Sequence, residues 1–353
     1  MEHLFQTKID NELQDKIVLF LTQQSAAIEQ YPGWYDISGN CHPVLYYIGM
    51  QNNSIVCYAT IIEPESKIAI IEFGPVFSNR DDALCSLKEI ARYYKRKFIG
   101  LKIQLFTPIG TDSEFIYQNL ALNQKIIHYV NKNENWSTLQ VDLSVPGEDI
   151  FKNFSKGHKS AIKKAQKQGL YVKEISDIES INQFIRIFVK MHESRSLHLD
   201  SEIHSIIPKI FNFLNEKGIG CILAVYNADN TMIGGIILIK QGKMVRYFKG
   251  AADPECRNFP VLHCALYEGI LKAKQWGATI FDFWGYCLLA DENDQRFNIN
   301  VFKKGFGGEL IIYPKTMYLL FNRFYFFIYK KIYATKYKKI IRDVLAIFIR
   351  RLK

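Results

Sequence analysis

Two short motifs in the last third of the chain contain residue types that could carry out a group transfer. Residues 281–285 read Phe-Asp-Phe-Trp-Gly, and residues 302–308 read Phe-Lys-Lys-Gly-Phe-Gly-Gly. The first motif is typical of a buried strand that ends in a carboxylate, Asp282, and a glycine. The second is typical of a turn that holds lysine ammonium groups beside aromatic rings and backbone N–H groups. Because a partly desolvated lysine can neutralise an anion or an oxyanion, the two motifs predict a transfer-enzyme site.

The elements that must position these motifs occur twice along the chain. Alternation of apolar and polar residues, with Asn, Gly and Asp at the turns, predicts three strands, a loop, a helix and a further strand in each half. In the first half these are residues 44–49, 55–62, 67–73, 83–97 and 99–106, and in the second half 221–226, 232–240, 243–252, 261–276 and 279–284. This order is the core of the acetyltransferase-like (GNAT) fold.

The repeat predicts an α/β (α+β) protein with tandem duplicated GNAT-like domains. We expect a first domain over residues 1–147 and a second over residues 148–313, because Pro-Gly punctuates the chain at 146–147. Residues 314–353 would form a basic, aromatic, helical C-terminal tail. A cleft between two such copies would be a favourable place for a ligand.

Basic charge is concentrated in that tail. Of 45 basic and 35 acidic residues, eleven and one fall in 314–353, so the preceding residues carry equal numbers of each. The tail has three interpretations: helices packed on the body with solvated basic faces, peripheral attachment to an anionic membrane, or nucleic-acid contact. If removal of 314–353 left sedimentation with anionic vesicles unchanged, the membrane interpretation would fail; if the tail completes the first domain, the same truncation would damage folding.

A second basic segment lies between the domains. Residues 150–168 are expected to form one helix rich in lysine, and its stretch from 155 to 168 contains no acidic residue. Its charges therefore repel one another, which an anionic ligand would relieve, whereas the simpler interpretation is a solvated helix face.

The remaining composition argues for a protein of the cytoplasm. The seven cysteines are scattered without a Cys-x-x-Cys pair, the first 14 residues do not resemble a signal peptide, and no stretch of 18 apolar residues occurs.

The histidines do not suggest a metal site. His192, His198 and His204 recur every six residues, which does not place them on one helix face. We therefore expect no metal site and no bound cofactor.

The loop before the second helix does not suit acetyl-CoA. Enzymes of the GNAT fold place a glycine-rich loop there, whose backbone N–H groups cradle the pyrophosphate. Here the loop reads Cys-Arg-Asn-Phe-Pro-Val over residues 256–261, with no glycine, and Pro260 removes a donor. The fold therefore predicts acyl transfer, whereas the loop argues against CoA as the donor.

The chain resembles the FemABX peptidoglycan-bridge aminoacyltransferases and their FemAB-like relatives in surface-polysaccharide loci. The similarity consists of an ordered set of short motifs between about residues 40 and 313: 74–77, 142–144, 158–169, 191–195, 247–251, 273–277, 281–285 and 302–308. The basic helix departs from the family pattern, with Lys159 and two small residues where arginines and an asparagine are usual. There is also no room for the long helical arm that some members carry.

The resemblance implies an acyl transfer from aminoacyl-tRNA to an amine of a lipid- or nucleotide-linked cell-envelope precursor. It places the Phe302-Lys303 pair at the transfer centre, with Lys303 serving the oxyanion or the leaving group. Asp282 would orient the amine or accept its proton, and its alternative role is to cap the following turn. The candidates for substrate binding are Arg246, Tyr247, Lys249, Arg195 and Lys159. Arg246 and Lys249 are expected on opposite strand faces, so only one would contact a diphosphate.

Two other functions remain open from the sequence. The first alternative is an acyl-CoA-dependent N-acyltransferase of capsule or O-antigen biosynthesis, acting on a sugar amine. The second is a non-enzymatic, membrane-associated adaptor, and the retained motif at 302–308 argues against it.

The sequence leaves the acceptor and the assembly open. A peptidoglycan stem peptide and an amino sugar are both open as acceptors, and the oligomeric state is not predicted. His263, at the start of the second helix, is expected to be structural rather than a base.

Overall fold

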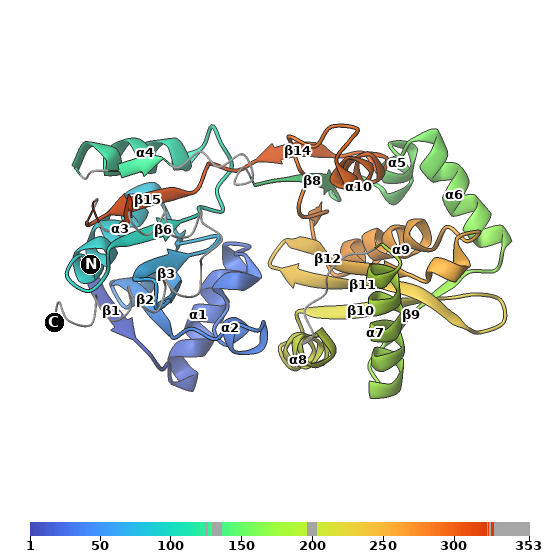
Figure 1. Ribbon diagram of the computed structural model, residues 1–353, viewed down its shortest axis with the longest axis horizontal. Coiled ribbons are helices and arrows are strands. Elements are labelled where there is room, and N and C mark those ends of the chain that lie inside the picture. The colour runs from blue at the N-terminus through green and yellow to red at the C-terminus, as the bar shows by residue number, and fades with distance from the viewer. Residues whose placement is uncertain (124–125, 129–135, 196–202, 323, 325, 328–353) are drawn as a thin grey trace. The chain divides into compact units, whose positions relative to one another are not determined.

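The computed structural model describes residues 1–123, 126–128, 136–195, 203–322, 324 and 326–327, and it divides the chain into two compact units (Figure 1). The first comprises residues 1–32, 41–135 and 313–353, and the second comprises residues 33–40 and 136–312. The predicted α/β fold with GNAT-like repeats is confirmed, because strands, helix and further strand follow in the expected order in both units.

The first unit is built on a mixed sheet with the strand order β1-β2-β3-β4-β6-β15-β7, and β5 pairs with β3. The strands are β1 (Glu2–Gln6), β2 (Val44–Gln51), β3 (Ser54–Ile62), β4 (Ile68–Ile71), β5 (Val76–Phe77), β6 (Gly100–Ile103), β7 (Ile126–His128) and β15 (Met317–Leu320). Its helices are α1 (Asn11–Gln23), α3 (Arg80–Tyr94) and α4 (Asp112–Asn123), with a 3₁₀ turn at Ile28–Gln30. Only β4 and β6 run parallel within this path.

The second unit repeats this arrangement with the strand order β14-β8-β13-β12-β11-β10-β9. The strands are β8 (Ser137–Asp142), β9 (Tyr171–Ile175), β10 (Gly220–Tyr226), β11 (Met232–Gln241), β12 (Met244–Ala252), β13 (Ile280–Asp282) and β14 (Glu309–Ile312). Here β12 and β13 form the parallel pair. The position of this pair matters for function, because Asp282 ends β13 and Arg246 lies opposite it on β12.

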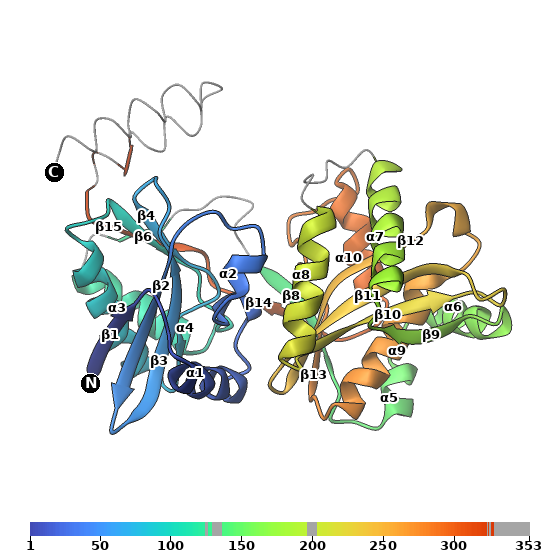
Figure 2. The same cartoon turned by 90° about the horizontal axis from the view of Figure 1, so that it is seen from below.

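Helices cover both faces of the second sheet (Figure 2). The helices of this unit are α2 (Trp34–Ile37), α5 (Gly147–Lys152), α6 (Lys156–Lys167), α7 (Ile178–Glu193), α8 (Ile203–Glu216), α9 (Val261–Gln275) and α10 (Gln295–Lys304), with a 3₁₀ turn at Pro254–Cys256; α7, α8 and α9 are those that pack on the sheet. Strand β11 is buried along almost its whole length, which explains its continuous apolar sequence. Ile236 and Leu238 belong to the core beneath α9, and the intervening side chains alternate to the other face.

One inner strand of each unit's sheet comes from the other half of the sequence. Strand β8, which follows β7 in the chain, pairs with β13 and β14 of the second unit, whereas β15 at the far end pairs with β6 and β7 of the first. The expected boundary at residue 147 therefore moves to 135/136, because β8 belongs to the second sheet. Residues 33–40 join the second unit through α2, whose Trp34 ring contacts Phe213 of α8.

Two expected helices differ in the structure. The basic helix predicted over 150–168 is interrupted at 153–155, because Ser155 caps a new helix by accepting a hydrogen bond from the N–H of His158. The tail predicted as helical from residue 314 begins instead with the strand β15, and its residues from 328 onward lie outside the described part. Among the residues that the structure describes, no helix is both long and apolar enough to cross a membrane.

Shortening one side chain of β15 is expected to destabilise the first unit. The strand β15 lies between β6 and β7, and the side chain of Leu319 is fully buried. Leu319→Ala should therefore lower the free energy of unfolding by about 2–5 kcal/mol. Urea unfolding with Leu310→Ala as the control measures this, because Leu310 also lies on a strand but is 43% exposed. Equal midpoints for the two variants would show that the tail strand contributes little to the unit.

Candidate active site

A buried carboxylate lies at the end of β13, where its parallel pairing with the first residues of β12 stops. Asp282 is fully buried, and its oxygens accept hydrogen bonds from the Thr138 hydroxyl at 3.0 Å, the Gln140 amide at 2.9 Å and the Trp284 N–H at 2.7 Å. The last of these bonds closes the following turn, so the capping role considered for Asp282 is present in the structure. Burial raises the pKa of Asp282, and the charge of Arg246 together with these hydrogen bonds opposes the rise.

Arg246 lies beside this carboxylate in the same buried layer. It is fully buried, pairs with Asp282 in the strand register, and its guanidinium carbon lies 3.2 Å from the centroid of the Trp284 ring. The guanidinium plane is suited to such stacking, which adds a cation–π attraction to the charge of the nearby carboxylate. Arg246 is therefore held inside the site by Trp284 and Asp282.

Lys303 approaches the same turn from the end of α10. It was expected on a turn, but it lies in the last helical turn of α10 and is 8% exposed. Its ammonium group donates to the carbonyl oxygens of Trp284 and Gly285, the second at 2.8 Å. Burial lowers the pKa of Lys303 to about 8, and the negative charge of Asp282 acts in the opposite direction. A lysine with this pKa exists in both protonation states near neutral pH.

In the turn after Asp282, the carbonyls of residues 284–287 are each held by a side chain. Trp284 and Gly285 both have positive φ, at 49° and 56°, which bends the chain sharply and suits glycine at the second position. Beyond the two Lys303 contacts, the Ser137 hydroxyl donates to the carbonyl of Tyr286 at 2.5 Å. The site therefore has a backbone whose position is fixed before any substrate arrives.

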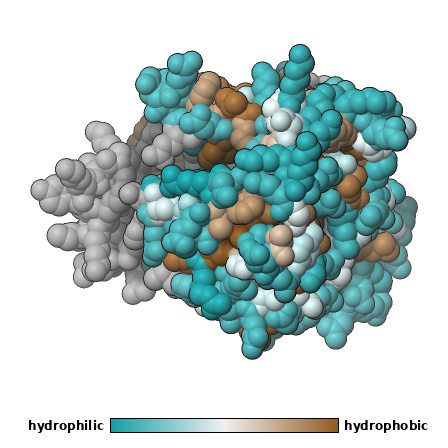
Figure 3. Space-filling model, turned by 90° about the vertical axis from the view of Figure 1, so that its right-hand side faces the viewer, coloured by the Kyte–Doolittle hydropathy of each residue, from teal (hydrophilic) through white to brown (hydrophobic). Residues whose placement is uncertain are grey.

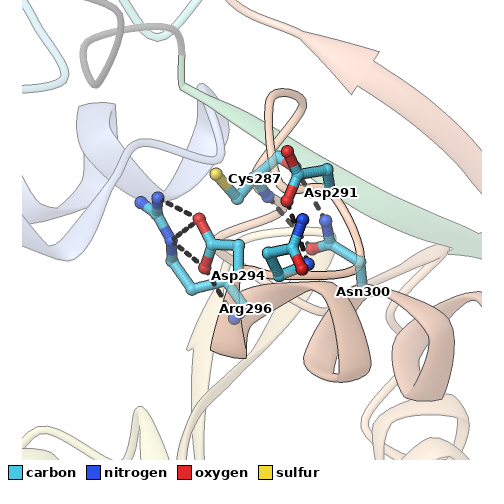
Figure 4. Close-up of polar contacts among 6 residues, drawn as sticks. Cys287, Asp291, Asp294, Arg296 and Asn300 are labelled. Carbon is cyan, nitrogen blue, oxygen red and sulfur yellow. Dashed lines mark hydrogen bonds and ion pairs between the residues drawn. The ribbon is translucent and has the colours of Figure 1, made fainter.

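One side chain of α10 fixes the next residue of this turn. The Asn300 side chain donates to the carbonyl of Cys287 at 2.7 Å and accepts from its N–H at 3.1 Å (Figure 4). Before α10, Asp294 caps the helix and pairs with Arg296, which lowers the pKa of Asp294 to about 2. Asn300 and Lys303 are three residues apart and thus lie on one helix face, directed at consecutive parts of the turn.

Phe302 faces a separate group of rings. Its ring centroid lies 5.4 Å from that of His158, 5.0 Å from that of His263 and 5.5 Å from that of Phe306. Burial, with a smaller contribution from His158, lowers the pKa of His263 to about 4, so this histidine is neutral near pH 7. That environment agrees with the structural role expected for His263.

The structure brings together only part of the predicted site. Asp282, Arg246 and Lys303 converge on one turn, but Lys159 donates to the carbonyl of Lys152 at 3.0 Å. Arg195 lies close enough to Tyr247 to lower the pKa of its hydroxyl, although burial dominates and raises that pKa to about 12. The motifs nominate Asp282, Arg246 and Lys303 as candidates, but which of the predicted residues come together depends on contacts between separate elements.

A bulge on β12 changes the expected alternation of the cationic residues. The register pairs Tyr247 with Leu238 and Lys249 with Ile237, so Phe248 has no partner between them. The Lys249 ammonium lies 5.8 Å from the centroid of the Phe188 ring of α7, and burial lowers its pKa. The simple two-residue rule that assigned Arg246 and Lys249 to opposite faces therefore fails across this strand.

Sequence reasoning missed Thr138 and Gln140, which bind the carboxylate of Asp282. Both lie on β8, which pairs with β13 across more than 130 positions of sequence. No local motif surrounds them, and the only available signal was the alternation of polar side chains along β8. Strand pairing at this separation depends on the tertiary fold rather than on the strand itself.

The loop before α9 carries acidic side chains rather than a phosphate cradle. Asp253 accepts a hydrogen bond from the N–H of Glu255, and Lys190 pairs with both carboxylates at 2.9 Å. Pro260 precedes α9 without a side-chain cap. Within the described residues, no cluster of three or more His, Cys, Asp or Glu side chains could hold a metal ion; His198 lies outside them.

Comparisons with known proteins give the same picture of the fold. Residues 152–296 match the family described as acetyltransferase (GNAT) domain. A lipid II:glycine glycyltransferase from Staphylococcus saprophyticus is 26% identical over 121 residues, which are 34% of this chain and 28% of that protein. The match thus spans little more than a quarter of that relative's length.

Solved structures extend the likeness over nearly the whole chain. The crystal structure of FemX is 18% identical, with a TM-score of 0.78 over 93% of this chain and all of the other. A tandem GNAT protein from the clavulanic acid biosynthesis pathway is 11% identical, with a TM-score of 0.52 over 91% of this chain and 99% of the other. The matched acetyltransferase (GNAT) domain and the duplicated sheets show a tandem GNAT fold similar to that of FemX, and the segment similar to the glycyltransferase supports the FemABX resemblance of the sequence.

Proposed function

We propose that this protein is an acyltransferase that moves an aminoacyl group from aminoacyl-tRNA to an amine of a cell-envelope precursor. The convergence of Lys303 and Asp282 on the Trp284–Gly285 turn carries this proposal. A neutral amine attacks the ester carbonyl, forming the C–N bond and a tetrahedral oxyanion. Collapse of the oxyanion breaks the ester C–O bond. The ester oxygen leaves with the nucleic acid and takes up the proton that the attacking amine gives off.

The ammonium group of Lys303 would supply positive charge for the oxyanion or for the departing oxygen. Its burial strengthens such an interaction, since a charge acts over a lower effective dielectric there than in water. Asp282 acts mainly by holding Trp284 and Arg246 in place, because its oxygens already accept hydrogen bonds from three groups. Arg246 adds the charge that balances the buried carboxylate.

Two features favour a nucleic-acid donor over acyl-CoA. The loop before α9 offers the carboxylates of Asp253 and Glu255, paired with Lys190, and no glycine backbone, where a pyrophosphate would need donors. Helix α6, in contrast, contains no acidic residue and exposes Lys156, Lys163 and Lys167. The side of the molecule on which α6 lies in Figure 1 faces the viewer in Figure 3 and is mainly hydrophilic.

Three of the exposed lysines form a row along one side of α6. Positions 156, 163 and 167 follow helical spacing, and the row extends for about 17 Å at 1.5 Å per residue. The side chain of His158, near the start of α6, bonds to the carbonyl of Phe302, so the row starts beside Lys303. A phosphate backbone whose acylated end reaches Lys303 would be attracted along this row.

The function is tested by offering the purified protein separate donors and acceptors. Labelled aminoacyl-tRNA or acetyl-CoA is mixed with lipid II, a UDP-linked muramyl peptide or a UDP-linked amino sugar, and products are identified by mass spectrometry. We expect transfer from tRNA to one of these amines. Transfer from acetyl-CoA alone would establish the acyl-CoA alternative, and no transfer from either donor would contradict the proposed enzyme activity.

Charge reversal on α6 is expected to weaken binding of the RNA. The double variant Lys163→Glu with Lys167→Glu should bind uncharged tRNA at least tenfold more weakly and reduce the salt dependence of log K by about two. Fluorescence titration at several salt concentrations measures both quantities. Lys95→Glu with Arg96→Glu, two exposed residues at the end of α3, is the matched control, and equal losses in both variants would show nonspecific attraction.

A further inference from the structure

The start of α6 and the end of α10 are joined at two points. The Nε2 atom of His158 lies 2.8 Å from the carbonyl oxygen of Phe302, and the N–H of Ser155 donates to the carbonyl of Gly305 at 2.8 Å. At this helix end the carbonyl of Phe302 also accepts from the N–H of Gly305 at 3.2 Å, so the imidazole is a second donor to the same oxygen. The helix end in question contains Lys303.

The hydrogen bonds of His158 define its tautomer. A carbonyl oxygen only accepts, so the ring proton sits on Nε2 and is donated to Phe302. In the neutral ring, Nδ1 then accepts from the hydroxyl of Ser155, 3.0 Å away, while the same oxygen accepts from the N–H of His158. Burial lowers the pKa of His158, which favours this neutral form.

The space around the ring is equally specific. A Cβ atom at Gly305 would lie 2.0–2.4 Å from three ring atoms of His158, so any larger residue must displace the imidazole. The ring also contacts Phe306 and His263, with centroids 4.6 Å away in each case. Glycine is required here for the close approach of the ring, because the backbone at Gly305 has an ordinary helical φ of −65°.

We propose that His158 is a positioning residue for Lys303, acting through the peptide group that joins Phe302 to Lys303. The oxygen that His158 binds belongs to the peptide unit whose nitrogen is that of Lys303. The backbone is thus held from one side by the imidazole, while the Lys303 side chain is held on the Trp284 and Gly285 carbonyls. Loss of the imidazole donor would release the backbone and let the ammonium leave the turn. This inference rests on the proposed role of Lys303 in transfer.

Two substitutions separate the hydrogen bond from packing. His158→Leu removes the donor at similar volume, whereas His158→Gln retains an N–H at comparable reach. With the transfer assay, we expect His158→Leu to lower kcat at least tenfold with an unchanged KM for the acceptor, and His158→Gln to recover to within about threefold of the unmodified protein. His204→Leu, at an exposed histidine of α8, should change neither constant. Full activity in His158→Leu, or equal losses in the Leu and Gln variants, would overturn the proposal.

A readout independent of turnover distinguishes this inference from the proposed function. The Lys303 amine can be titrated by NMR through its ε-methylene signals in isotope-labelled protein. In His158→Leu its pKa should rise from about 8 towards 10.5, because the ammonium becomes hydrated, and His158→Gln should restore it. If the protein shows no transferase activity but these shifts occur, only the proposed function fails. If activity is present and the pKa of Lys303 does not move, the positioning role is refuted.

Gly305→Ala provides a second route should His158→Leu fold poorly. Its added methyl group must displace the imidazole, so the variant should reproduce the rise in the Lys303 pKa while leaving His158 in the sequence. In the double variant Gly305→Ala with His158→Leu, the two effects should not add, because both remove the same hydrogen bond. Additive effects would show that His158 and Gly305 act independently, against the proposal.

Discussion

Replacing Lys303 with alanine is expected to lower kcat by about 10²–10³, the usual cost of removing one group that stabilises a developing oxyanion. The reason is geometric as well as electrostatic. Lys303 is nearly completely buried and its ammonium group already lies on the Trp284 and Gly285 carbonyls, so no reorganisation is needed to present the charge. Single-turnover transfer of a labelled aminoacyl group measures the effect on the chemical step.

Lys304→Ala is the matched control, because Lys304 is the next residue of α10 and is exposed. It should transfer at the rate of the unmodified protein. A Lys303→Ala variant that folds normally and retains its turnover would eliminate the role assigned to Lys303. Circular dichroism and thermal unfolding of both variants establish whether folding is intact.

The depressed pKa of Lys303 also predicts how the reaction responds to pH. The ammonium is lost as pH rises through about 8, so the contribution of its charge should fall above that pH. The Lys303→Arg variant stays charged over this range. Dividing the rate of the unmodified protein by the rate of this variant at each pH removes the effect that ionisation of the acceptor amine has on both. The ratio of unmodified to Lys303→Arg rates should decline above pH 8; a flat ratio would mean that the charge on Lys303 is not used.

The same pKa affects stability. Between pH 8 and 10.5 the unfolded chain binds more protons at Lys303 than the folded protein does, so this group makes the free energy of unfolding rise with pH.

Asp282→Ala is expected to destabilise the second unit by about 3–5 kcal/mol and to abolish transfer. The change leaves the Thr138 hydroxyl and the Trp284 N–H without their buried acceptor, and it removes the carboxylate beside the buried charge of Arg246. Urea unfolding followed by tryptophan fluorescence measures the stability. Trp284 lies in the affected turn and stacks on Arg246, so its emission reports local change.

The comparison variant for Asp282 is Asp291→Ala. Asp291 is exposed and accepts a hydrogen bond from the N–H of Asn293 in the same loop region (Figure 4). Its replacement should cost less than about 1 kcal/mol, since exposed hydrogen bonds exchange readily with water. Asp282→Asn should fall between the two, because the amide oxygen can still accept from Thr138 and Trp284. Midpoints for Asp282→Ala and Asp291→Ala within about 1 kcal/mol of each other would show that the buried carboxylate contributes no more than a surface one.

Local patterns predicted the repeated elements, for reasons that the structure makes clear, and they singled out two residues of the candidate site. Strands such as β11 are buried on both faces and helices such as α9 have apolar residues at helical spacing, so periodicity is sufficient to find them. Asp282 and Lys303 were identified because each lies in a short motif with glycine nearby. Those motifs reflect a strand end and a helix end, both set by local sequence.

The remaining contacts were not predictable because they depend on distant parts of the chain. Gln140 reaches Asp282 only because β8 pairs with β13, and His158 reaches Phe302 only because α6 begins beside the end of α10. The bulge at Phe248 likewise changed the direction of Lys249, and the only local sign of it is Gly250, which on its own does not fix where the register shifts. Alternation along a single strand holds only while the register is regular.

The placement of β15 has a consequence for the order in which this protein is made. A ribosome synthesises β6 and β7 long before residues 317–320, yet β15 lies between these two strands in the finished sheet. The first unit therefore cannot complete its sheet when residues 1–135 have been made, and the edges of β6 and β7 that pair with β15 stay unpaired until residues 317–320 follow. The second unit receives β8 before its other strands are synthesised, so it can finish its sheet as soon as β14 emerges. In this chain, the half encoded first is the half completed last.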